Sequence, residues 1–145
     1  YDDVVEEVGV FLASRVHEAR EAGVRLESLV VDPGLGFGKS VDQNWDLIHG
    51  SRRLCEAGIP VLGAASRKSF LERICGSGVA PADRGPASVM ASIIQYRGGV
   101  RLFRVHDVAL HAAGLDKAES LGVPVVPAES FDRLLELGLD GVLQR

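Results

Sequence analysis

The chain has 145 residues, 46% of them apolar, so it is about one domain long and can bury a core. Its net charge is −4, with 16 basic and 20 acidic residues interspersed, and it has no lysine-arginine tract of the kind that binds nucleic acid or an acidic membrane. No apolar run reaches the roughly 18 residues of a membrane span, and no signal peptide is visible. We therefore expect a soluble, cytoplasmic protein with no nucleic-acid or membrane partner.

The first predicted element is an amphipathic helix that begins at Val4, because its apolar residues follow the i, i+3, i+4, i+7 spacing of one helix face. Gly23 is placed to end this helix as a left-handed cap. Residues 29–31 form a β-branched run that predicts a strand buried on both faces, as in a parallel sheet. The next helix is predicted to start at the N-cap Asp42 and to close by Gly58.

A second strand is predicted at residues 59–64, followed by a short helix that runs to Cys75. Residues 76–85 contain three glycines and indicate a surface loop. Pro86 suits the first turn of the helix that follows. That helix, residues 87–94, is almost entirely small or apolar, so we expect it to be covered on several sides.

A third strand is predicted at residues 100–105, with Asp107 as the cap of a helix that ends near Gly122. The C-terminal tail, residues 123–145, contains a short amphipathic helix. This alternation implies right-handed β-loop-α units and a parallel sheet. Three strands cannot close an eight-stranded barrel of about 250 residues, so the chain is either a small three-layer α/β domain or the later half of a barrel. Because it opens at Tyr1 directly in a helical pattern, we expect a piece of a longer protein.

Polar side chains follow each of the three predicted strands. Asp32 ends the first strand, Ser66 and Lys68 follow the second, and Arg104 and His106 follow the third. The carboxyl ends of parallel strands meet at one edge, so these groups should converge on a common rim where ligands bind. The cations could hold an anion or polarise a carbonyl while the acid accepts two N–H donors. A lone strand-end aspartate is often only a helix cap or an ion-pair partner, but the convergence favours a site.

The turn after the first strand carries Gly34, Gly36 and Gly38. Their G-x-G-x-G spacing differs from the dinucleotide-binding G-x-G-x-x-G, and Pro33 stands where a phosphate-binding P-loop needs its first glycine. We interpret the alternating glycines as letting the backbone approach a flat ligand, with Phe37 offering a ring face.

The remaining reactive side chains have simpler interpretations. Cys55 and Cys75 are expected to be buried, reduced thiols. Arg67 and Lys68 could also be ordinary surface charges that pair with helix acids such as Glu72. No spacing of His, Cys or carboxylate residues suggests a metal site. The histidines in helical patterns are expected at the surface: His17, His49 and His111.

Three segments resemble, in order and spacing, the late signatures of the dihydropteroate synthase family: Asp32-Pro-Gly-Leu-Gly-Phe-Gly-Lys39 with Asn44, Ser66-Arg-Lys-Ser-Phe70, and Arg104-Val-His-Asp-Val108. The resemblance covers about residues 29–121. It implies an α/β fold, a partial TIM (β/α)8 barrel, in which residues 1–122 form the C-terminal half with parallel strands six to eight and flanking helices. The family, usually dimeric and a sulfonamide target, condenses 6-hydroxymethyl-7,8-dihydropterin diphosphate with p-aminobenzoate. The products are 7,8-dihydropteroate and pyrophosphate, in folate biosynthesis.

By position, the resemblance implies that Asp32 hydrogen-bonds the amino-pyrimidine edge of the pterin and that Lys68 reaches its carbonyl and ring nitrogen. Arg104 would stack over the pterin and, with His106, bind pyrophosphate, so Lys68, Arg104 and His106 would be the catalytic residues. No protein nucleophile is needed, because the cations stabilise the leaving anion in a dissociative transition state. The family uses Mg²⁺, whose ligand is expected from the absent N-terminal half rather than from this chain. The p-aminobenzoate side would be lined by Gly36, Phe37, Gly38 and Ser66.

Two positions depart from the family pattern. Ala64 stands where glycine is usual, and its methyl group could crowd the pterin; Gly85-Pro86 replaces a common polar residue. The leading hypothesis is a transferase, homodimeric and active only in a full-length protein with about 120 more residues upstream. The alternative is a non-catalytic pterin-binding homologue or scaffold subunit that pairs with an active enzyme, and Ala64 is its best support. A pterin-dependent methyltransferase on the same barrel gives no reason for the motif at residues 66–68.

Overall fold

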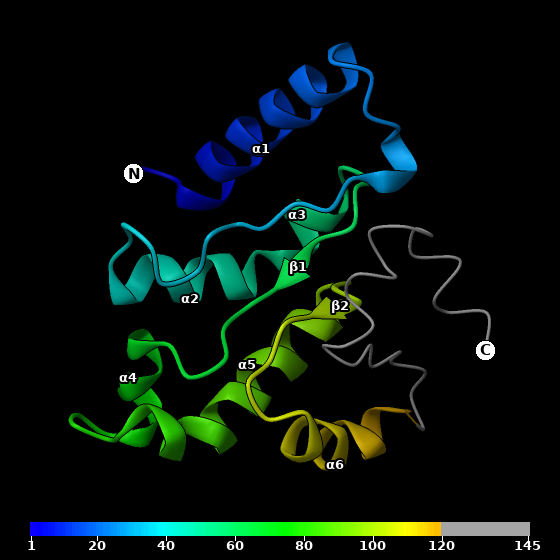
Figure 1. Ribbon diagram of the computed structural model, residues 1–145. Coiled ribbons are helices and arrows are strands. Elements are labelled where there is room, and N and C mark those ends of the chain that lie inside the picture. The colour runs from blue at the N-terminus through cyan, green and yellow to red at the C-terminus, as the bar shows by residue number, and fades with distance from the viewer. Residues whose placement is uncertain (120–145) are drawn as a thin grey trace.

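The computed structural model describes residues 1–119, with side chains up to residue 114, and it alternates helices with short parallel strands (Figure 1). The predicted helix end at Gly122 and the predicted tail helix within residues 123–145 lie outside the described residues. The helices are α1 (Val4–Glu21), α2 (Val41–His49), α3 (Ser51–Cys55), α4 (Glu72–Cys75), α5 (Gly85–Arg97) and α6 (Val108–Glu119). The strands are β1 (Leu62–Gly63) and β2 (Leu102–Phe103), and the 3-10 helices are η1 (Leu26–Ser28), η2 (Ser69–Leu71) and η3 (Pro81–Arg84).

The sheet is parallel, as the alternation predicts. β1 pairs with β2 so that Leu62 lies opposite Leu102. On the other side of β1, Val31 forms a parallel bridge with Val61. The Val31 N–H donates to the Pro60 carbonyl at 2.9 Å, and the Leu62 N–H donates to the Val31 carbonyl at 2.8 Å. Three successive chain segments therefore lie side by side in sequence order, which confirms the α/β class and the parallel arrangement.

The predicted strand lengths are wrong. The strands expected at residues 59–64 and 100–105 are two residues long, and residues 29–31 contribute only the bridge at Val31. Val30 is 38% exposed, so this segment is not buried on both faces. The physical reason is that, within the described part of the chain, residues 29–31 are paired on the β1 side only, which leaves an open sheet edge.

Side-chain caps fix the starts of α1 and α2, in one case not at the predicted residue. Asp3 caps α1 by accepting the N–H groups of the first turn, and Gly23 follows its end with a φ of +91°, as predicted. The predicted N-cap Asp42 is wrong. Ser40 caps α2 in a capping box with Gln43, and Asp42 lies in the first turn.

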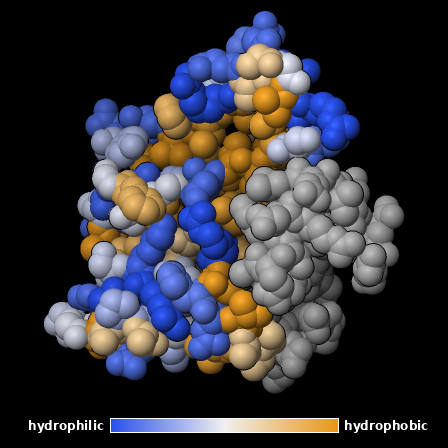
Figure 2. Space-filling model, viewed as in Figure 1, coloured by the Kyte–Doolittle hydropathy of each residue, from blue (hydrophilic) through white to orange (hydrophobic). Residues whose placement is uncertain are grey.

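One hydrophobic cluster joins the amino-terminal turns of α1 to the helices and the sheet. Trp45 of α2 and Phe70 of η2 meet edge to face, with ring centroids 5.9 Å apart. The first half of the apolar face of α1 is buried more deeply than the second, because Val8 is buried, Leu12 is half-buried against the cluster, and Phe11 is 60% exposed. Figure 2 shows hydrophobic surface beneath α1, with hydrophilic residues below it in the middle of the same face.

Burial corrects two further predictions and confirms a third. His111 is 1% exposed rather than a surface residue; its Nδ1 lies 2.9 Å from the Asp107 carbonyl oxygen, and its Nε2 has no partner within the described part. Cys55 and Cys75 are half-buried rather than buried, and both are free thiols. Helix α5 is covered on several sides, as predicted, since Pro86, Met90 and Arg97 are its only exposed residues. Of the helices that the structure describes, none has the length and apolar content to cross a membrane.

Candidate functional site

The turn that follows Val31 is shaped by Asp32 and by three glycines. Asp32 Oδ1 accepts the Gly34 N–H at 2.8 Å. Gly34, Gly36 and Gly38 have φ values of +69°, +78° and +60°, which residues with a Cβ rarely adopt. A Cβ on Gly36 would also lie 2.7 Å from Cδ of Lys68. The alternating glycines are thus required by the left-handed backbone and, at Gly36, by the close approach of a site lysine.

Asn44 fixes this turn to the start of α2. Its side chain is buried at 1% exposure, its Oδ1 accepts the Gly36 N–H at 2.6 Å, and its Nδ2 donates to the Ser40 carbonyl at 2.7 Å. The motif contained Asn44, but sequence reasoning gave it no role. The amide therefore positions the glycine turn relative to the start of α2.

Lys68 crosses from the end of β1 to this turn. Its Nζ donates to the Leu35 carbonyl and lies 4.5 Å from the centroid of the Phe37 ring. The ring of Phe37 is 67% exposed, so it presents one face to the ammonium group and the other to solvent.

Arg104 and Lys39 reach the same place from β2 and from the turn itself. Arg104 Nη2 lies 3.3 Å from Asp32 Oδ2 and forms an ion pair that joins the first and third strand ends. Lys39 Nζ donates to the carbonyl oxygens of Gly34 at 3.1 Å and Phe37 at 3.2 Å. Three cations therefore gather round one carboxylate, and the surplus of positive charge suits an anionic ligand.

Burial changes the acidity of two of these cations. It lowers the pKa of Lys68, the Asp32 carboxylate opposes this shift, and the charges of Arg104 and Lys39 add to it. Burial likewise lowers the pKa of Lys39, again opposed by Asp32. Each amine is thus partly desolvated, which strengthens any hydrogen bond that it gives to a ligand.

Ser66 and His106 form a second contact between strand ends. The buried Ser66 Oγ accepts the His106 N–H at 3.1 Å and also lies 3.1 Å from His106 Nδ1. The imidazole remains exposed. Ser66 therefore holds His106 through its backbone N–H and its Nδ1.

The structure thus brings most of the predicted site residues together. Asp32, Gly36, Phe37, Lys68 and Arg104 form one cluster, and the Ser66–His106 pair adjoins it along the strand ends. Gly38 stands exposed, with open space where a Cβ would lie. The alternative in which Arg67 or Lys68 pairs with Glu72 is not what the structure has, because Glu72 pairs with Arg84.

Sequence reasoning missed the buried residues behind Ser66, Arg67 and Lys68. Arg84 is 7% exposed and Ser88 is fully buried, and both hydrogen-bond the backbone of Arg67. Their separation from Arg67 by 17 and 21 positions gives no local signal. A charged residue next to an otherwise small and apolar helix was the only available hint.

The departure at Ala64 can be placed by the sheet register. A Cβ at Gly63 would lie 2.7 Å from Phe103 and 3.1 Å from Gln95 of α5, so this position faces the helix layer and requires glycine. Successive strand residues point to opposite faces, so Ala64 faces the other way, on the side of Asp32 and Arg104. Its side chain is 3% exposed.

A hollow of about 440 Å³ adjoins the glycine turn. It lies between the turn, the start of α2 and the segment from η2 to the loop after α4. Its walls include Gly36, Lys39, Asn44, Ser69, Phe70 and Arg73. A flat molecule seated here would lie beside Gly36.

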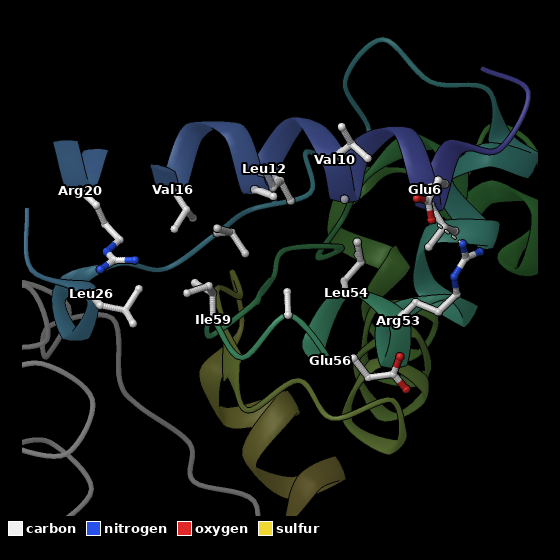
Figure 3. Close-up of a pocket in the computed structure, with 15 residues that line it drawn as sticks. Glu6, Val10, Leu12, Val16, Arg20, Leu26, Arg53, Leu54, Glu56 and Ile59 are labelled. Atoms are coloured by element: carbon white, nitrogen blue, oxygen red, sulfur yellow. Dashed lines mark hydrogen bonds and ion pairs between the residues drawn. The ribbon is translucent and has the colours of Figure 1, made fainter. Parts of the chain in front are cut away.

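A larger groove of about 620 Å³ runs beneath α1 (Figure 3). Leu12 and Val16 of α1 point down toward Ile59, and the ion pair of Arg53 with Glu6, at 2.8 Å, lies at one end. The lining is mainly apolar, and no strand-end residue of the cluster belongs to it. The groove therefore suits hydrophobic packing rather than the polar chemistry of the strand ends.

The described residues do not suit a divalent metal. They contain no group of three or more His, Cys, Asp or Glu side chains that could hold one. Asp32 is the one carboxylate in the cluster, and the cations that surround it oppose a second positive charge.

Comparison with known proteins gives consistent matches. Residues 1–106 match the family described as "Pterin binding enzyme". A dihydropteroate synthase from Haemophilus influenzae is 39% identical over 110 residues, which are 75% of this chain and 39% of that protein. The structure of dihydropteroate synthase from Xanthomonas albilineans in complex with 7,8-dihydropteroate matches with a TM-score of 0.80 and 41% identity, over 88% of this chain and 47% of that one. The Thermus thermophilus enzyme in complex with 6HMPPP matches with a TM-score of 0.78 and 40% identity, over 83% of this chain and 48% of that one. The chain thus spans about two fifths to one half of the length of these relatives.

Proposed function

Because this chain belongs to the pterin-binding enzyme family, we propose that it is the later part of a dihydropteroate synthase that is active in its full-length form. The full-length protein would condense 6-hydroxymethyl-7,8-dihydropterin diphosphate with p-aminobenzoate. The observation that carries this proposal is the strand-end cluster, in which Asp32 lies 3.3 Å from Arg104 and beside the partly desolvated Lys68 and Lys39. It combines an acceptor for an amino-pyrimidine with cations for a diphosphate.

Pterin binding would use Asp32 and Lys68. A carboxylate offers about four lone-pair positions, and here one oxygen accepts the Gly34 N–H while the other faces Arg104. Two neighbouring N–H donors of a pterin would bind this carboxylate once the exposed Arg104 side chain moves over the ring. Lys68 Nζ would then donate to the pterin carbonyl and ring nitrogen in place of its present bond to Leu35.

In the reaction, the C–O bond between the pterin methylene and the diphosphate breaks, and pyrophosphate leaves with the electron pair. The amine of p-aminobenzoate donates its lone pair to the methylene and loses a proton. Arg104 and His106, which end the β2 segment, would bind the departing anion and so lower the barrier. Lys68, Arg104 and His106 are the proposed catalytic residues.

The p-aminobenzoate would lie against the glycine turn. Phe37 offers an exposed side chain, Gly38 has open space where a Cβ would lie, and the hollow of about 440 Å³ adjoins Gly36. Ser66 is the fourth proposed residue on this side. Because its hydroxyl is engaged with His106, we expect its effect on p-aminobenzoate to act partly through that imidazole.

We also propose that residues 1–122 supply strands six to eight of a TIM barrel and that the full-length protein is a cytoplasmic homodimer. The open edge at Val31 and the apolar groove beneath α1 would be where earlier β/α units pack. The Mg²⁺ expected from the family would need protein ligands from those units, since the described residues provide none.

A turnover assay with the full-length protein tests the proposal. With the pterin diphosphate and p-aminobenzoate together, we expect equimolar release of pyrophosphate and formation of 7,8-dihydropteroate. Without p-aminobenzoate, release should fall to background. Pterin binding without turnover would contradict the proposal and revive the alternative of a non-catalytic homologue, which none of the relatives named above supports.

A further inference from the structure

Arg67 has an unusual backbone conformation between two site residues. Its φ is +60°, and it is the one non-glycine residue with positive φ among residues 1–119. A left-handed conformation is disfavoured for a residue with a Cβ, so it persists only where surrounding contacts impose it. Arg67 directly follows Ser66 and directly precedes Lys68, so its conformation sets the direction in which Lys68 leaves the strand.

Both backbone polar groups of Arg67 are held from one side. Its N–H donates to Ser88 Oγ at 3.0 Å, and its carbonyl accepts from Arg84 Nη1 at 3.1 Å. Ser88 Oγ in turn donates to the Arg84 carbonyl at 2.7 Å. Arg84 and Ser88 thus form a closed clamp on a single residue, and both are buried.

The clamp is itself anchored. Arg84 donates from Nε and Nη2 to the Val79 carbonyl, at 3.0 and 2.9 Å, and Nη2 also pairs with Glu72. With its bond to Arg67, the guanidinium uses four of its five N–H donors in a fixed planar fork, an arrangement that lysine cannot reproduce. The loop before α5, the helix α4 and the end of β1 are thereby joined at one buried group.

We infer that Arg84 and Ser88 are positioning residues that hold Arg67 in the left-handed conformation and thereby direct Lys68 into the strand-end cluster. Lys68 is the group through which the clamp reaches the site, because its Nζ crosses to the Leu35 carbonyl and the face of Phe37. The effect on pterin affinity rests on the proposed function; the effect on the Lys68 side chain does not.

Ser88→Ala tests this inference, with Ser92→Ala as its matched control. Ser92 is also a buried serine of α5, one turn further on, and donates to the Ser88 carbonyl at 3.1 Å without touching Arg67. In the full-length protein we expect Ser88→Ala to weaken pterin affinity about tenfold, the scale of the left-handed backbone cost, and Ser92→Ala to leave it unchanged. Equal effects of the two variants would overturn the inference.

A readout without pterin separates this inference from the proposed function. Burial lowers the pKa of Lys68, and release of the clamp should let the side chain reach solvent and move that pKa up toward 10.5. NMR titration of isotopically labelled lysine would follow this pKa in wild type and in both serine variants. An unchanged Lys68 pKa in Ser88→Ala would refute the clamp, whereas failure of wild type to bind any pterin would refute only the proposed function.

Rescue distinguishes positioning from general destabilisation. Glycine adopts positive φ without a Cβ penalty, so Arg67→Gly should make the clamp less necessary. In the Arg67→Gly background, Ser88→Ala should change the Lys68 pKa and pterin affinity much less than it does alone. An undiminished effect of Ser88→Ala would show that Ser88 acts by another route. If Ser88→Ala does not fold, Arg84→Lys is compared in the wild-type and Arg67→Gly backgrounds instead.

Discussion

Replacing Gly36 by alanine perturbs the backbone and a site lysine together. The φ of +78° is unfavourable for alanine, and the new Cβ would lie 2.7 Å from Cδ of Lys68. The left-handed backbone costs about 1–2 kcal/mol of folding free energy. Lys68 would have to move, because its aliphatic chain is the flexible partner, and its contacts with Leu35 and Phe37 would be lost.

Gly38→Ala is the matched control, since Gly38 has a φ of +60° and open space where its Cβ would lie. In the full-length protein, urea unfolding should show a loss of about 1–2 kcal/mol for both variants. Isothermal titration with a pterin should show about a ten- to hundredfold loss of affinity for Gly36→Ala alone, the scale of one charge-assisted hydrogen bond.

Equal pterin affinity in Gly36→Ala and Gly38→Ala would refute the claim that the approach of Lys68 to the glycine turn matters for binding. A loss of affinity in both variants, in proportion to their loss of stability, would refute it as well. The p-aminobenzoate KM is a separate readout, because Gly36 and Gly38 are both proposed to line that side.

Three further predictions concern the same cluster. Lys68→Ala should weaken pterin affinity by about 2–4 kcal/mol, measured by calorimetry, and an unchanged affinity would make Lys68 an ordinary surface cation. Because burial puts the pKa of Lys68 below its ordinary 10.5 in the folded state, the unfolded chain holds more protons between the two values. The free energy of unfolding should therefore rise with pH up to about 10.5, and Lys68→Met should reduce that slope in urea titrations, leaving the part due to Lys39. Ala64→Gly should raise pterin affinity while costing about 0.5–1 kcal/mol of stability, and a lower affinity would mean that the methyl group supports the ligand rather than crowding it.

The strand-end residues could be predicted because their geometry follows from a general rule. Parallel β-loop-α units bring the carboxyl ends of strands together, so Asp32, Lys68 and Arg104 had to meet if the order of elements was right. The structure places Asp32 and Arg104 3.3 Å apart although 72 positions separate them. This prediction depended on the order of the elements and not on individual side-chain contacts.

Features that depend on particular tertiary contacts could not be predicted. His111 has the helical spacing of a surface residue, but it is buried at 1% exposure, and nothing local marks this. The clamp of Arg84 and Ser88 on Arg67 joins residues of the loop, helix and strand end that are far apart in sequence. Strand length could not be predicted either. An apolar run shows where a strand can form, but the pairing with neighbouring strands decides how many of its residues form one.

The N-cap of α2 shows a smaller error of the same kind. Asp42 and Ser40 are both good caps by residue type, and the choice depended on Gln43, which completes the capping box with Ser40. The signal was present in the sequence, in the spacing of Ser40 and Gln43.

The most direct test of the central claim is calorimetric titration of the full-length protein with a pterin, wild type against Asp32→Asn. Asparagine keeps the size of the side chain but replaces one acceptor oxygen by a donor, so it cannot accept two N–H groups from the amino-pyrimidine edge. We predict binding by wild type and at least about a tenfold loss in the variant, because two charge-assisted hydrogen bonds are disrupted. Equal affinity of the two proteins would contradict the claim that Asp32 and its strand-end cations form the pterin site.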